Sequence, residues 1–149
     1  MRRLVRIAGG LRPLALAVLG AGWVWYGQGI ITDPRYGTAR GLAGLTRYIP
    51  LSALGWLWVA AGAVAVAAGV ARRFPCWQAA GFAALAAPAF LWGLSFIRTA
   101  VFGGYPSASG SAAAWTAFAV FVVLVAGLAE PGWVIEALRD RPRAGDGGG

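Results

Sequence analysis

The sequence has no histidine, lysine or asparagine, and its 149 residues include one cysteine and five acidic residues. Without histidine, neither a histidine-based catalytic triad nor the common zinc sites can form. The single cysteine, Cys76, has no partner for an internal disulfide. No acidic residue lies within a long apolar run, although proton-coupled transport and intramembrane aspartyl chemistry need one there. We therefore expect no enzymatic activity, no cofactor and no metal site.

Charged residues are also scarce, at 12% against roughly 25% in typical soluble domains. Hydrophobic residues make up 59% of the chain, the net charge is +8, and all 13 basic residues are arginine. A soluble nucleic-acid-binding protein gathers its basic residues on one folded face, whereas these arginines separate apolar runs. The lipid bilayer is therefore the expected partner, and nucleic acid is not. The bias toward arginine, alanine and glycine is typical of a high-GC bacterium, so we expect the bacterial inner membrane.

Four apolar runs of 18 to 21 residues cover 14–31, 51–71, 77–97 and 112–129. A helix needs about 20 apolar residues to cross a bilayer. We predict an all-α fold, a polytopic transmembrane four-helix bundle of two outward hairpins within a domain of residues 1–132. Residues 133–149 are expected to form a cytoplasmic amphipathic turn and a disordered tail. Alternatively, the first run is the core of a signal peptide, which leaves three spans.

The connection between the first two runs is the largest polar stretch between spans. Asp33 followed by Pro34 is typical of a helix N-cap with proline at the first helical position. Beyond it, three apolar residues share one helical face, opposite two arginines: Leu42, Leu45 and Ile49 against Arg40 and Arg47. We predict a short interfacial helix over 34–49, its leucines in lipid. Its glycines also allow a partly ordered loop. Two interpretations of the arginines remain: they contact phosphate headgroups, or they form a docking patch for an acidic partner.

Three further polar or helix-breaking residues are candidate functional or interface positions. Gln28 is the lone amide near the end of the first run, Pro88 stands near the centre of the third, and Arg98 closes the third. Broken helices line binding sites in some transporters, and a buried arginine marks a functional site. The simpler interpretations are an amide reaching interfacial water, an ordinary proline kink, and an arginine that snorkels to the phosphates.

Small residues form stripes on the second run. One stripe contains Ala61, Ala65 and Gly69, and the neighbouring stripe contains Ala63, Ala67 and Ala71. Such stripes allow helix backbones to approach closely in lipid, within one chain, within a homo-oligomer or with another membrane protein. In an alanine-rich chain the same pattern also arises by chance.

The orientation follows from the arginines. The N-terminal segment has four, the turn after the second run two and the tail three, nine in all, against four on the other side. The positive-inside rule therefore places both termini in the cytoplasm. Six of the eight tryptophans then lie toward the outer leaflet as a predicted aromatic belt: Trp23, Trp25, Trp56, Trp58, Trp92 and Trp115.

Three segments carry a resemblance to a known group: GWVWYGQGIITDPRYGTARGLAGL, GWLWVAAGAVAV and WTAFAVFVVLVAGLAEP. In layout, and in its tryptophan, glycine and Glu-Pro positions over about residues 14–132, the chain resembles small membrane proteins of actinobacterial (Streptomyces-type) phages and prophages. This resemblance implies four spans and a place among virion structural genes, without an established activity or catalytic residue.

The sequence thus predicts a non-enzymatic integral membrane protein, linked to a phage or prophage, that acts through membrane or protein contacts. Two alternatives remain. A holin-like oligomer that permeabilises the membrane fits the small size, the several spans and the basic end. A passive channel or transporter subunit would use Gln28, Pro88 and Arg98 as its polar landmarks.

Overall fold

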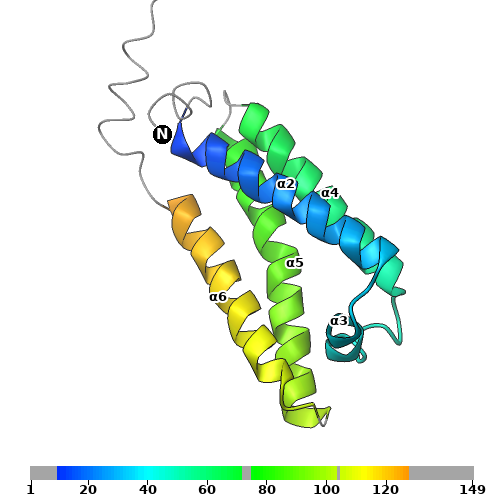
Figure 1. Cartoon of the computed structure of the whole chain (residues 1–149). Coiled ribbons are helices and arrows are strands. Elements are labelled where there is room, and N and C mark those ends of the chain that lie inside the picture. The colour runs from blue at the N-terminus through cyan, green and yellow to red at the C-terminus, as the bar shows by residue number, and fades with distance from the viewer. Residues whose placement is uncertain (1–9, 72–74, 104, 128–149) are drawn as a thin grey trace, which may run out of the picture.

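Long apolar helices make up most of the computed structural model, which describes residues 10–71, 75–103 and 105–127 (Figure 1). In chain order the helices are α2 (Leu11–Thr32), α3 (Tyr36–Gly41), α4 (Leu51–Val70), α5 (Pro75–Phe102) and α6 (Ala108–Gly127). All of them except α3 are long and apolar enough to cross a membrane. The predicted all-α architecture is confirmed, including the short helix between the first two spans. The chain is a four-span integral membrane protein.

The second hairpin has longer helices than the predicted spans. The helix α5 continues past Arg98 to Phe102, so Arg98 lies within the helix and does not close it. The helix α6 begins at Ala108, and its first turn is closed by backbone bonds from Ala108 to Tyr105 and from Ser109 to Pro106, both 3.0 Å. Small polar residues are accepted there because the first helical turn is free to face water. The predicted turn and tail over 133–149 lie outside the described residues.

The antiparallel helices α2 and α4 form the most extensive backbone contact between helices in the described chain. In this interface a glycine or proline recurs at every seventh position of each helix. These residues face each other in pairs, Pro13 with Gly69, Gly20 with Gly62, and Gly27 with Gly55. A Cβ atom on either Gly20 or Gly27 would lie 2.7 Å from the carbonyl oxygen of the facing glycine. A seven-residue repeat keeps the same faces together along a left-handed crossing. This repeat brings the two backbones into contact.

One of the two predicted small-residue stripes takes part in this packing. Ala61 and Ala65 are 7% and 0% exposed, and Gly69 is also buried. Ala63 and Ala67 on the other stripe are exposed. The structure therefore uses the first stripe inside the monomer and leaves the second on the outer surface.

The two hairpins are joined at the end of the bundle that holds the start of α2. Arg12 donates a hydrogen bond of 2.7 Å to the carbonyl of Ala126, in the last turn of α6. Its guanidinium also lies 5.7 Å from the ring centre of Phe82 on α5. A cation at a helix C-terminus is favourable because the terminal carbonyls carry partial negative charge. The contact places the N-terminal end of α2 beside the C-terminal end of α6 (Figure 1).

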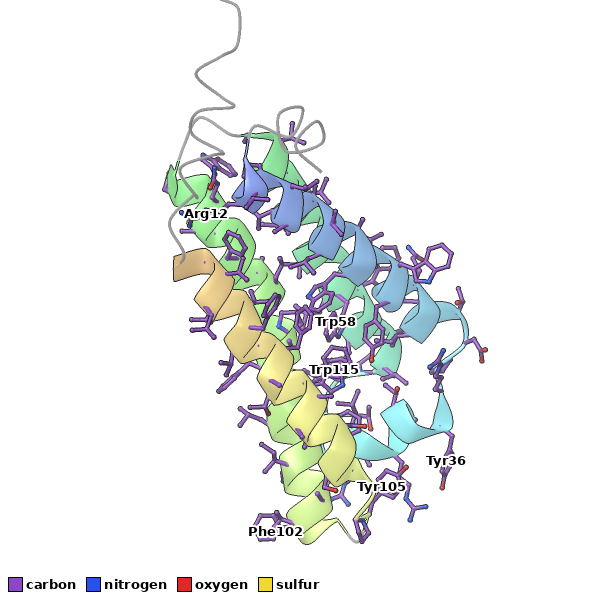
Figure 2. All side chains as sticks on the ribbon, turned by 60° about the vertical axis from the view of Figure 1, so that its left-hand side comes forward. Arg12, Tyr36, Trp58, Phe102, Tyr105 and Trp115 are labelled. Carbon is purple, nitrogen blue, oxygen red and sulfur yellow. The ribbon has the colours of Figure 1, made fainter. Side chains whose placement is uncertain are left out.

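Aromatic side chains fill the space between the hairpins (Figure 2). Trp58 is fully buried at their centre, with ring centroids 4.7 to 5.1 Å away on four neighbours: Trp23, Tyr26, Trp92 and Trp115. The Trp23 indole donates to the carbonyl of Leu85 at 3.1 Å, one turn before the buried Pro88, and α5 runs on as a helix through that proline. These rings lock all four spans together.

This cluster corrects the predicted aromatic belt. Trp58 and Trp92 are fully buried and Trp23 is 7% exposed, whereas only Trp25 and Trp56 of the six predicted belt residues are classed as exposed, at 84% and 58%. Packing large aromatic rings against one another inside the bundle is favourable. The hairpins contact each other directly through α4 and α5, and these large rings also pack between the spans.

Candidate functional site

The segment between α2 and α4 folds back onto α5. The carbonyl of Gly41 accepts hydrogen bonds from Thr99 Oγ1 at 2.8 Å and from Ser95 Oγ at 3.2 Å. A side chain at position 41 would collide with the ring of Phe96, so the backbone can only reach α5 because the residue is glycine. Leu42, the next residue, is fully buried. The end of α3 is therefore attached to α5 by both polar and apolar contacts.

Two predictions about this segment are wrong. The helix occupies only Tyr36–Gly41, its N-cap residue is Arg35, and Asp33 instead ends α2, with its backbone N–H bonded to the Gly29 carbonyl at 2.9 Å. The predicted lipid-facing stripe is also divided. Leu42 is fully buried in the protein core, Leu45 is partly buried against it, and Ile49 is 39% exposed. The helix can end early because Ser95 and Thr99 donate hydrogen bonds to the Gly41 carbonyl, which would otherwise lose its partner in the next turn.

Three predicted candidate residues from distant parts of the chain meet at this end of the bundle. A pocket of about 290 Å³, here called the arginine pocket, is lined by Arg40, Ala43, Gly44, Arg47, Arg98, Thr99, Phe102 and Gly103. The first two arginines come from the α3 segment and the third comes from α5. The convergence was not visible in the sequence, where Arg40 and Arg98 are far apart.

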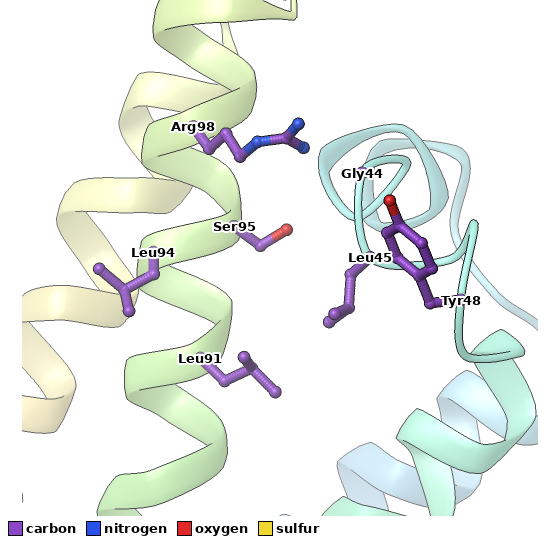
Figure 3. A pocket seen from close by; sticks show the side chains of 7 residues that line it. All are labelled: Gly44, Leu45, Tyr48, Leu91, Leu94, Ser95 and Arg98. Carbon is purple, nitrogen blue, oxygen red and sulfur yellow. The ribbon is translucent and has the colours of Figure 1, made fainter.

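One of these arginines, Arg40, is held in place by neighbours, and another, Arg98, lies beside the α3 segment. Arg40 donates a 2.8 Å hydrogen bond to the Tyr36 hydroxyl, and its guanidinium lies 4.9 Å from the ring centre of Tyr105. An arginine over an aromatic ring is attracted by the negative face of the ring. The Arg98 guanidinium lies against Gly44, where any side chain would collide with it (Figure 3). Two tyrosines and one glycine, all uncharged, thus contact the arginines that line the pocket.

The positive charge of the arginine pocket is not compensated within the described chain. No acidic residue lines it, and none of its three arginines forms an ion pair with a described residue. Asp33 is the only acidic residue in the described ranges, and it lines a different pocket of about 170 Å³ together with Arg35. Converging guanidinium groups without an acid attract anions, phosphate above all.

An apolar pocket adjoins the arginine pocket. It has a volume of about 300 Å³ and is lined by Gly44, Leu45, Tyr48, Leu91, Leu94, Ser95 and Arg98. Figure 3 shows Arg98 reaching from α5 toward Gly44, with Leu91 and Leu94 earlier on the same helix. Arg98 and Gly44 line both pockets. Arg98 therefore lies at the boundary between the cationic arginine pocket and the apolar pocket.

The remaining candidate residues lie elsewhere. Gln28 is exposed on α2, where its backbone carbonyl accepts a 2.9 Å bond from Thr32 Oγ1, and Pro88 is buried within α5. Neither lines the arginine pocket. Sequence reasoning missed Ser95 and Thr99, although their four-residue spacing beside Arg98 gives the end of the third span one polar face. That signal could have indicated a docking surface.

Comparisons of the chain with protein-family models, with curated proteins and with solved structures found no match. The resemblance to phage membrane proteins accordingly stays a prediction.

Proposed function

We propose that this protein is a non-enzymatic membrane protein of the bacterial inner membrane that acts through contacts at the α3 end of its bundle. The observation that carries this proposal is the convergence of Arg40, Arg47 and Arg98 on one pocket that no described acidic residue lines. The chemical inventory also supports a non-catalytic role, because the sequence has no histidine and only one cysteine, Cys76. The contact partner is lipid or another membrane protein.

The packing favours this role over a holin-like lesion. A lesion needs a polar face to line water, yet the outer faces of the long helices expose apolar side chains such as Val18, Val64 and Val120. In the described helices, exposed polar side chains such as Gln28 and Ser52 lie close to helix ends. The aromatic cluster around Trp58 fills the interior. A passive channel is also disfavoured, because Gln28 and Pro88 do not line the pocket that contains Arg98.

We further propose that both termini are cytoplasmic and that the gene belongs to a phage or prophage. The arginine distribution along the sequence supports the orientation, with nine arginines in the N-terminal segment, the turn after the second apolar run and the tail, against four in the other connections. The layout of tryptophan, glycine and Glu-Pro positions supports the phage link. Gene neighbours test that link, since tail or portal genes beside this one agree with it and an adjacent endolysin gene would instead favour the holin-like alternative.

Controlled expression in a bacterium tests the proposed role directly. We expect growth to continue and a membrane-impermeant dye to stay excluded while the full chain accumulates in the membrane fraction. The expected result follows because no described span carries a polar face along its whole length. Sudden dye uptake at a critical expression level would contradict the proposal and identify a lesion-forming oligomer.

A further inference from the structure

We propose that the arginine pocket and the adjoining apolar pocket together bind one anionic phospholipid. Its phosphate headgroup lies among Arg40, Arg47 and Arg98, and an acyl chain lies along α5 in the apolar pocket. This inference rests on the proposed function and deepens it, because it names a lipid as the partner of the same site.

The arginine pocket suits a phosphate head. A guanidinium presents a planar fork of N–H donors that matches two oxygens of one phosphate. Three such groups line a space of about 290 Å³, and no described acidic residue lies there to compete for them. The Thr99 hydroxyl is already bonded to Gly41, so the arginines are the free donors of the pocket. The head of highest affinity is therefore anionic.

The apolar pocket suits an acyl chain. Leu91 precedes Arg98 on α5 and points toward Leu45 of the α3 segment, and Leu94 also lines the pocket. The seven steps along the chain from Leu91 to Arg98 span about 10 Å of helix. A chain that leaves a headgroup at Arg98 can therefore follow α5 toward the middle of the membrane. A free phosphate would leave this pocket empty.

The site is preorganised, which distinguishes it from a general attraction between arginines and a membrane surface. That preorganisation lies in Arg40, which Tyr36 and Tyr105 hold. Side chains already held in their binding geometry lose less conformational entropy when the ligand arrives. A merely electrostatic attraction would depend on the number of charges and not on their positions.

Arg35 provides a matched control for that distinction. It is exposed in the same connecting segment, and its removal changes the charge by the same amount. It lines the pocket with Asp33 and does not line the arginine pocket. Arg47 gives the cleanest test variant, since no described residue forms a hydrogen bond, an ion pair or a ring contact with its side chain, and its loss should leave the fold intact.

The experiment titrates the purified full chain, in a neutral detergent, with phosphatidylglycerol, phosphatidylcholine, glycerol phosphate and inorganic phosphate. Native mass spectrometry counts the bound molecules. We expect phosphatidylglycerol to bind at least about tenfold more tightly than the other three probes. Arg47→Gln and Arg98→Gln should each weaken phosphatidylglycerol binding by about tenfold, and Arg98→Lys by less, because it keeps the charge and loses the fork. Arg35→Gln should change it less than about twofold.

Three outcomes would overturn the proposal. Equal losses with Arg35→Gln and Arg47→Gln would mean that charge alone attracts the lipid. Equal binding of phosphatidylglycerol and phosphatidylcholine would mean that the arginines do not select the head. Inorganic phosphate binding as tightly as phosphatidylglycerol would indicate a free-phosphate site. The dye-uptake assay is independent of all three outcomes. If the lipid titration fails, the non-lytic role still stands, and if dye enters the cells, the lipid-binding result still stands.

Discussion

Gly20 and Gly22 lie two positions apart on α2, and their surroundings are opposite. A Cβ at Gly20 would lie 2.7 Å from the carbonyl oxygen of Gly62 and 3.0 Å from the backbone nitrogen of Val66. A Cβ at Gly22 would meet nothing within 4 Å. Backbone atoms cannot rotate away as a flexible side chain can, so an added methyl at Gly20 must push α2 and α4 apart. Glycine is needed at only one of these positions.

We predict that Gly20→Ala destabilises the protein by about 1–3 kcal/mol, the usual cost of overpacking a tight interface. Gly22→Ala is the matched control and should be neutral or stabilising by up to about 1 kcal/mol, because alanine favours a helix over glycine. Thermal unfolding of the purified variants in one detergent measures both. Equal unfolding temperatures for the two variants would show that close contact of α2 and α4 is not required.

The α3 segment is the element whose environment differs most from the expectation. It has the arginine and leucine pattern of a helix lying in lipid, yet its leucines turn inward because α5 offers donors for the Gly41 carbonyl. The contact also fixes the distance between the α3 segment and Arg98. Docking of this element therefore creates the arginine pocket, and its release would separate the three arginines.

This docking can be tested by thiol labelling in a Cys76→Ser background. We predict slow labelling of Leu42→Cys and fast labelling of Ala43→Cys, because Leu42 is fully buried and Ala43 is exposed. Adding Thr99→Val to Leu42→Cys should raise its labelling by about fivefold, as expected for the loss of about 1 kcal/mol of hydrogen bonding.

The control for that experiment is Thr116→Val, the same change on α6, which should leave labelling at position 42 unaltered. Equally fast labelling at positions 42 and 43 in the otherwise unaltered segment would contradict the docked arrangement. The segment would then be an exposed loop whose arginines act separately.

The whole molecule has two chemically different ends. One end carries the start of α2 and the finish of α6, joined by Arg12 and Ala126, and the other carries the α3 segment and the arginine pocket. Between them, the outer surface of the described spans is apolar and the interior is aromatic. The bundle can therefore hold a polar site at one membrane surface without a polar path across its centre.

We predict that the end with the arginine pocket faces away from the cytoplasm. A reporter active only outside the cytoplasm should work when inserted at Pro106, in the short connection before α6, and should fail when fused after Gly149. A reporter active only in the cytoplasm should give the opposite pattern. Activity of the first reporter after Gly149 would reverse the orientation.

The sequence by itself determined that four helices cross the membrane and that the chain lacks the usual catalytic and metal-binding residues. The physical reason is that spanning is a local property. Every backbone group of a segment in lipid must bond within its own helix, so run length and composition are enough. Even the α2–α4 contact left a trace in the sequence, the seven-residue repeat of Gly20, Gly27, Gly55, Gly62 and Gly69.

Only the tertiary structure decided which tryptophans are buried, where Leu42 points, and that Arg98 meets Arg40 and Arg47. These are contacts between segments distant in sequence, and they depend on how the helices cross. A tryptophan near a span end is equally compatible with a lipid-facing belt and with a buried cluster. The choice follows from how the four spans pack against one another, and no single span carries that information.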